Sequence, residues 1–451
     1  MKRNKSFSSI IPIVLIATIA LIASLPALAQ QKPWTLRECC DYAVAHNISI
    51  KQQDNRCRQQ ELQLSTARNS RLPDLSASIG ENFSFGRGLT AENTYTNTNT
   101  SSTSFSLGTS VPLFTGFQIP NSIKLNQLNL EAATQDLEKA KNDIRTQVAK
   151  AYVQILYDME INDVARRQIA IDSLQVHRLQ VMLDNGKASP AELSQLQATL
   201  AQSRLTATQA DNQLQLDVLA LTQLLELPSP EGFSIVRPEV DGLMSHDLVT
   251  VSPDLIYQEA LTVRPEVAAE QLRLQGTENS IKIAQSALYP SLSFSAGLGT
   301  NYYKTSGFNA DGFGKQLKNN FSQYLGLNLQ IPIFNRFSTR NNIRSARIDQ
   351  ETQQLQLDNV KKSLYKEIQQ VYYNAVAAQE KWKSSEQAMH AAQDAFTLMQ
   401  AKYENGKANL TEFNESKNNY LKSESDLVQA QYEYVYQSRL LDFYRGRELN
   451  F

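Results

Sequence analysis

The chain has 451 residues, of which 44 are Lys or Arg and 45 are Asp or Glu, so its formal net charge is -1. This balance excludes the strongly basic surface of a nucleic-acid-binding protein, and we expect no nucleic-acid partner. With 41% hydrophobic and 20% charged residues, the composition also excludes global disorder and predicts a sizeable buried core.

Residues 1–29 are typical of a secretory signal peptide. Three basic residues among the first five precede an apolar run over residues 10–23, and Ala27-Leu28-Ala29 forms a cleavage-like site before Gln30. An uncleaved membrane anchor is the alternative interpretation, which Pro26 disfavours. After Gln30 no apolar run is long enough for a spanning helix, so an exported chain that resides in a membrane would have to cross it by β-strands.

Three cysteines follow, Cys39, Cys40 and Cys57, which is an odd number for an oxidising compartment. Their spacing matches no zinc or redox motif. We expect them to be small apolar side chains on helix faces. A disulfide from Cys57 to Cys39 or Cys40 is the alternative.

Two short sequence motifs recur with the same separation along the chain, which indicates a tandem duplication. Val111-Pro112-Leu113-Phe114 returns as Ile331-Pro332-Ile333-Phe334 (331 − 111 = 220), and Asn185-Gly186-Lys187 returns as Asn405-Gly406-Lys407 (405 − 185 = 220). The predicted units, in chain order, are the signal peptide (1–29), a first repeat (30–237), a connector (238–252) and a second repeat (253–451).

Each repeat contains a window in which glycine is concentrated and apolar residues alternate with small polar ones. The windows predict strand pairs over residues 74–114 and 291–334, with short helices before each pair. The polar runs Gly86 to Ser104 and Gly299 to Asn320 are predicted to be solvated loops between the paired strands. One apolar and one polar face per strand suits a barrel with lipid outside and water inside, although a half-exposed hairpin of a soluble protein has the same pattern.

Gly and Pro are absent over the 65 residues from Asn121 to Asn185, and apolar residues there recur at steps of three and four. An unbroken helix of that length would measure about 98 Å. Long helical hairpins are therefore predicted over residues 120–227 and 338–445, with each Asn-Gly-Lys word at the turn. The packed positions are expected to be Ile144, Val148, Ala151, Ile155 and Met159 in the first hairpin, and Leu364, Ile368, Val371, Ala375 and Ala378 in the second.

This duplicated order resembles the TolC-type outer membrane efflux family over essentially the whole mature chain. The resemblance implies a mainly α fold with a membrane β-barrel part, in which a homotrimer forms one barrel and an α-helical tunnel. It also implies an outer-membrane channel that is the exit duct of a tripartite efflux system, with a periplasmic adaptor and an inner-membrane pump as partners. Independently, four strands in one chain cannot close a water-filled barrel, so membrane-embedded strands would require an oligomer in contact with outer-membrane lipid.

The resemblance also assigns site residues near the hairpin turns. It implies a periplasmic gate made by Glu412 and Glu415, six and nine residues after Gly406, with Tyr403 linked to Glu192. A basic residue that the family uses two positions after the glycine is replaced here by Ala408, with Lys407 as a neighbouring substitute. Ordinary exposed glutamates on a surface helix are the alternative interpretation. The implied contacts with the adaptor are the two turns, Asn185, Gly186, Lys187, Asn405, Gly406 and Lys407.

The sequence shows no motif that predicts catalysis. HExxH, GxSxG, CxxC and phosphate-binding glycine loops are absent, and the four histidines are scattered. We therefore expect no enzyme activity, no cofactor and no metal site. A type I protein secretion duct and an exported coiled-coil scaffold without a pore remain alternative functions.

Overall fold

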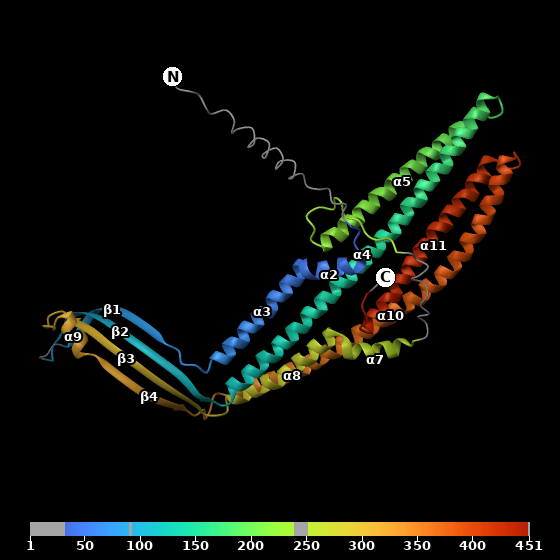
Figure 1. Cartoon of the computed structure of the whole chain (residues 1–451). Coiled ribbons are helices and arrows are strands. Elements are labelled where there is room, and N and C mark those ends of the chain that lie inside the picture. The colour runs from blue at the N-terminus through green and yellow to red at the C-terminus, as the bar shows by residue number, and fades with distance from the viewer. Residues whose placement is uncertain (1–31, 90–92, 239–250, 450–451) are drawn as a thin grey trace, which may run out of the picture.

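The structure is a computed structural model and describes residues 32–89, 93–238 and 251–449. The predicted signal peptide and most of the predicted connector lie outside the described residues. A β-sheet stands at one end of the molecule, and long helices run from it to two hairpin turns at the other end (Figure 1). The sites implied by the resemblance are therefore far from the strands.

The sheet has four antiparallel strands in the order β1-β2-β3-β4. They are β1 (Ser76–Leu89), β2 (Tyr95–Thr115), β3 (Ser291–Thr305) and β4 (Ser322–Gln330). Strands β2 and β3 come from different repeats and pair over most of their length. The sheet thus joins the two repeats, while β1 and β4 are its two edge strands.

Cross-strand pairing places apolar residues on one face of this sheet and small or polar residues on the other. Ile79 lies opposite Phe105, and Phe294 lies opposite Leu327. On the other face the hydroxyls of Ser78 and Ser106 are 2.7 Å apart. The apolar face is solvent-exposed in the single chain, including Ile79, Phe83, Phe85, Leu325, Leu327 and Leu329.

The structure differs from the predicted strand pairs in three places. The run Gly86 to Ser104 is mostly strand, because Thr and Asn residues of β2 pair with β1 up to Leu89 and Tyr95. In the second repeat β3 extends to Thr305, and helix α9 (Phe313–Asn319) occupies part of the predicted loop. Strand β4 ends at Gln330 instead of residue 334, because its partner Ser291 is already the first residue of β3.

Each repeat contains one helix of 67 residues followed by one of 35 residues. In the first repeat these are α4 (Gln118–Asp184) and α5 (Pro190–Leu224), and in the second α10 (Ser338–Glu404) and α11 (Leu410–Tyr444). At 1.5 Å per residue the longer helices measure about 100 Å. The shorter helices that precede each strand pair are α2 (Leu36–His46), α3 (Ile48–Asn69), α7 (Pro253–Val263) and α8 (Pro265–Ser286).

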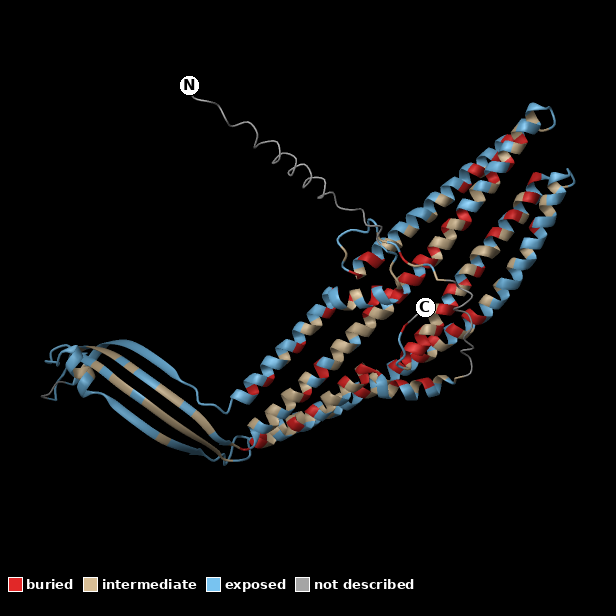
Figure 2. Cartoon of the chain, viewed as in Figure 1, coloured by how far each residue is buried: buried red, intermediate tan, exposed pale blue. Residues whose placement is uncertain are grey.

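The predicted helix-packing positions form the main core. Leu364, Ile368, Val371, Ala375 and Ala378 are all buried in α10. In α4, Ile144, Val148 and Ile155 are buried, while Ala151 and Met159 are partly buried against the same cluster. Buried residues lie along the inner faces of the helices, and the sheet has almost none (Figure 2). The hydrophobic core that stabilises one chain is therefore helical.

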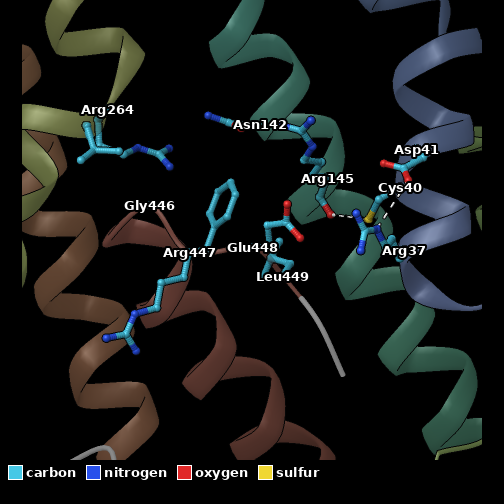
Figure 3. A pocket seen from close by; sticks show the side chains of 12 residues that line it. Arg37, Cys40, Asp41, Asn142, Arg145, Arg264, Gly446, Arg447, Glu448 and Leu449 are labelled. Carbon is cyan, nitrogen blue, oxygen red and sulfur yellow. Dashed lines mark hydrogen bonds and ion pairs between the residues drawn. The ribbon is translucent and has the colours of Figure 1, made fainter.

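All three cysteines are buried and free. The Cys57 thiol donates to the carbonyl of Ala133 (3.2 Å), and the Cys40 thiol faces the carbonyl of Arg145 beside a cleft lined by Arg37 and Asp41 (Figure 3). Burial raises the pKa of both Cys39 and Cys40 to about 12. The prediction of small apolar side chains holds, and the alternative disulfide does not form.

Candidate functional site

Both Asn-Gly-Lys words form the hairpin turns with the same hydrogen bonds. The amide of Gly186 donates to the carbonyl of Leu183 (2.9 Å), and the amide of Lys187 donates to that of Met182 (2.8 Å). Gly186 and Gly406 have φ of 70° and 68°, a left-handed conformation that glycine adopts without steric cost. The sequence thus folds into two matching exposed turns at the end of the helices opposite the sheet.

Two of the predicted gate acids also cap the helices that follow the turns. Glu192 accepts the amide of Ser189 (3.3 Å) at the start of α5, and Glu412 accepts the amide of Asn409 (3.1 Å) at the start of α11. Each pair forms a capping box: the cap side chain accepts a hydrogen bond from the backbone amide of the glutamate, and the glutamate side chain accepts one from the backbone amide of the cap residue. Both side chains remain exposed, so capping fixes the position of each charge at the end of its hairpin.

Glu415 lies one turn after Glu412 on α11 and is also exposed. Residues three apart on a helix lie on one face, so the two carboxylates are neighbours. The described part of the chain provides no ion-pair partner for Glu415 or for Lys407, the proposed substitute for the missing basic residue. Within one chain these groups are therefore free to face a second molecule.

Tyr403 packs into a second hydrophobic cluster next to the turns. Its ring stacks on Phe413 with centroids 4.8 Å apart, beside buried Leu179, Leu193 and Leu410. Burial, and secondarily the charge of Glu192, raise the pKa of the Tyr403 hydroxyl. The structure brings Tyr403 close to Glu192 but records no hydrogen bond between these two described residues.

Ion pairs that no sequence pattern predicts join the two hairpins. Near the turns, Arg178 of α4 contacts the carboxylate of Glu404 (3.2 Å) and its carbonyl (3.2 Å) at the end of α10. Further from the turns, Arg167 of α4 contacts Glu424 of α11 at 2.7 Å. Sequence separations of 226 and 257 residues left no local pattern that would have revealed these pairs.

Between these two pairs lies a fully buried one. The Lys417 ammonium contacts Asp172, and their side chains are 0% and 1% exposed. Ser203 of α5 donates a hydrogen bond of 2.5 Å to the second oxygen of Asp172, so three helices meet at one carboxylate. The sequence does contain one indication of this buried pair. Lys417 lies four residues after Phe413 and four before Leu421, at a helix position where an apolar residue is expected.

The described residues contain no group of three or more His, Cys, Asp or Glu side chains that could hold a metal ion. No helix among them combines the length and hydrophobicity needed to cross a membrane. The site is therefore an arrangement of exposed acids and inter-hairpin ion pairs around two turns.

The model of the outer membrane efflux protein family matches residues 40–226 and 256–447. The chain belongs to the outer membrane efflux protein family. The two matched segments cover both hairpins and the sheet, so the resemblance inferred from the repeated words is confirmed. This family consists of transport proteins of the Gram-negative outer membrane, and the chain is an efflux channel protein located there.

Individual relatives agree with this assignment. The chain is 21% identical over 406 residues to outer membrane efflux protein BepC of Brucella suis, covering 90% of this chain and 84% of BepC. It is 25% identical over 273 residues to the pyoverdine export outer membrane protein OpmQ of Pseudomonas aeruginosa, covering 58% of this chain and 54% of OpmQ.

Solved structures show the same fold. The outer membrane protein VceC of Vibrio cholerae superposes with a TM-score of 0.74 at 18% identity, covering 92% of this chain and 96% of VceC. CusC superposes with a TM-score of 0.75 at 17% identity, covering 94% of this chain and 96% of CusC. The efflux channel protein thus has the fold of known outer-membrane channels.

Proposed function

We propose that three copies of this efflux channel protein join their sheets edge to edge and form one membrane barrel continued by a helical tunnel. The main support for this proposal is that the sheet of one chain is open at both edges. Edge strands β1 and β4 have one partner each among the described strands, and one face of the sheet is apolar and exposed. Open strand edges in lipid are costly, and pairing between copies removes them.

In this arrangement the strand loops face the cell exterior and the two hairpin turns face the periplasm. The turns are the exposed ends of the long helices, and they are the surface offered to a periplasmic adaptor that connects the channel to an inner-membrane pump. A separate pump would supply the energy for transport, since the sequence contains no nucleotide-binding glycine loop. The exposed turn residues Asn185, Lys187, Asn405 and Lys407 are the proposed contacts.

Glu412 and Glu415 are proposed to line the closed periplasmic end. Threefold repetition would place six carboxylates around one axis, which attracts cations and repels anions. The ion pairs from α4 to the second hairpin, Arg178 to Glu404 and Asp172 to Lys417, would hold the two hairpins together in the closed state. Opening then requires the exposed pair to separate first, because the buried pair is far more costly to break.

Chemical crosslinking between the edge strands tests this assembly. Cysteine replacements at Asn82 of β1 and Asn328 of β4, in a background without the native cysteines, should be joined between copies by a short bifunctional thiol reagent. A ladder ending at three chains is expected. A matched pair at Asn82 and Ser295, which lies on the inner strand β3, should give no ladder. Monomers alone from the edge pair would contradict the proposal.

A further inference from the structure

A buried carboxylate in the first hairpin is only half satisfied. Asp158 of α4 is 5% exposed. Its Oδ1 atom accepts a hydrogen bond of 3.1 Å from the amide of Gln154, while its Oδ2 atom is buried and has no hydrogen-bond donor. Burying an ionised carboxylate with one oxygen unpaired costs folding free energy. Another group near Asp158 must therefore offset that cost.

The group that faces Asp158 is a second carboxyl. Asp217 of α5 lies within hydrogen-bonding reach across the α4–α5 interface. It is itself fixed by a hydrogen bond of 2.8 Å from Gln213. Burial, followed by the facing carboxyl of Asp217 and its charge, raises the pKa of Asp158 to about 7. Two carboxyls in contact favour a single proton between them over two negative charges.

Within the described part of the chain, two other acids of α4 and α5 have cationic partners, unlike Asp158 and Asp217. Asp172 is paired with Lys417, and Asp211 is 3.6 Å from Arg166. No Lys, Arg or His of the described residues lies within ion-pair distance of Asp158.

The charged groups on the other sides do not compensate Asp158 either. On α11, Asp426 lies near the hydroxyl of Tyr157, the residue before Asp158, and its carboxylate is negative, so it adds no counter-charge. Lys150 and Glu433 line a pocket beside Gln154, and their opposite charges offset each other. From the segment after α5, Arg237 is paired with two other carboxylates of α4, Glu160 at 3.5 Å and Asp163 at 2.8 Å.

We propose that Asp158 and Asp217 form a proton-binding site that makes the packing of α4 against α5 depend on pH. A shared proton gives the buried Oδ2 of Asp158 the hydrogen bond that it lacks. Loss of the proton leaves two facing charges and pushes the helices apart. This site goes beyond the proposed assembly and gate, because it involves two helices of a single hairpin.

The direction of the pH dependence follows from the raised pKa of Asp158. Separated carboxyls release their protons near pH 4, whereas the packed pair keeps one up to about pH 7. The packed state therefore binds more protons in this window, and its stability falls as the pH rises from about 4 to about 7. Above that range the site contributes no stabilisation.

The location connects the site to the hairpin tip. Asp158 precedes the end of α4 at Asp184 by 26 residues (184 − 158 = 26), which is about 39 Å along the helix. The ion pairs to the second hairpin begin at Arg167, between Asp158 and the turn. Loosening of α5 at Asp217 would thus occur on the sheet side of the described ion pairs from α4 to the second hairpin.

Hydrogen exchange of the full-length protein in detergent tests this proposal. Peptides covering residues 211–221 should lose protection several-fold between pH 5.5 and pH 8.5, after correction for the intrinsic pH dependence of exchange. Asp158→Asn and Asp217→Asn each replace one carboxyl by a neutral hydrogen-bonding amide. Both variants should keep at pH 8.5 the protection that the unmodified protein has at pH 5.5.

Asp211→Asn is the matched control, because it removes a cation-paired carboxyl from the same helix, and it should retain the pH response. Asp217 is only half-buried, so Asp217→Asn tests the proposal even where Asp158→Asn fails to fold. A flat profile in the unmodified protein, or an unchanged fall in Asp217→Asn, would overturn the proposal. Restoration of protection at pH 8.5 by Mg²⁺ or Ca²⁺ would show a cation site and overturn the shared proton.

Discussion

At the scale of single residues, the proposed closure of this channel protein depends on a few charged side chains. Glu412 and Glu415 are exposed near the second turn, and Glu412 is fixed there by its capping bond to Asn409. A fixed ring of acids at the narrowest point would set ion preference, while the pairs on α4 would set how often the end opens.

The double variant Glu412→Gln, Glu415→Gln should lose cation selectivity. Gln also serves as the third residue of a capping box, so the helix start is retained while the charge is removed. Reversal potentials in planar bilayers under a salt gradient measure this change, and the variant should move toward the value of an unselective pore. A reversal potential equal to that of the unmodified protein would make the two acids ordinary surface residues.

Arg178→Gln should increase conductance without altering selectivity, because it breaks the pair with Glu404 and leaves the acids in place. Single-channel currents measure this effect. Tyr403→Phe is the matched control: it keeps the stack on Phe413 and removes a hydroxyl that has no recorded hydrogen bond to Glu192. Equal conductance in the Arg178 variant and the unmodified protein would exclude a role for this pair in closure.

Lys417→Met should destabilise the helical region by about 3–5 kcal/mol, because it leaves the Asp172 carboxylate buried without its counter-charge. Adding Asp172→Leu should recover most of this loss, since an apolar pair of similar size avoids desolvation of two charges. Denaturant unfolding followed by circular dichroism measures both variants. A Lys417 variant as stable as the unmodified protein would show that the pair does not hold the hairpins together.

At the scale of elements, the two turns depend on their glycines. Gly406→Ala forces an alanine into the left-handed conformation, at a cost of about 1–2 kcal/mol. Faster proteolytic cleavage at the second turn is expected, and limited proteolysis measures it. Gly314→Ala is the matched control, since it lies in helix α9 with open space around its Cα and should have no such effect. Equal cleavage of both variants would contradict the assigned role of the glycine.

The elements also show what the sequence could reveal. The packed positions of α10 were predictable because apolar residues at steps of three and four leave a regular pattern, as Ile368 and Val371 do. The extent of β2 was not, because its Thr and Asn residues resemble a loop until a partner strand is known. The links at Asp172 and Arg178 depend on packing between distant segments, which one sequence does not encode locally.

For the whole molecule, we propose that the sheet loops lie outside the cell and the hairpin turns lie in the periplasm. In a background without native cysteines, Asn309→Cys should be labelled in intact cells by an impermeant thiol reagent, whereas Lys187→Cys should not. Labelling of both in broken cells is the control for accessibility. Labelling at position 187 alone in intact cells would invert the orientation.

The central claim is that several copies of this chain enclose one water-filled channel that is closed at the hairpin turns. Planar-bilayer recording of the purified, detergent-extracted protein tests it most directly. We expect discrete current steps of low conductance that favour cations, because the acids are proposed to line the narrow end. A bilayer that contains the protein and shows no current steps, in the unmodified form and in Arg178→Gln alike, would contradict it.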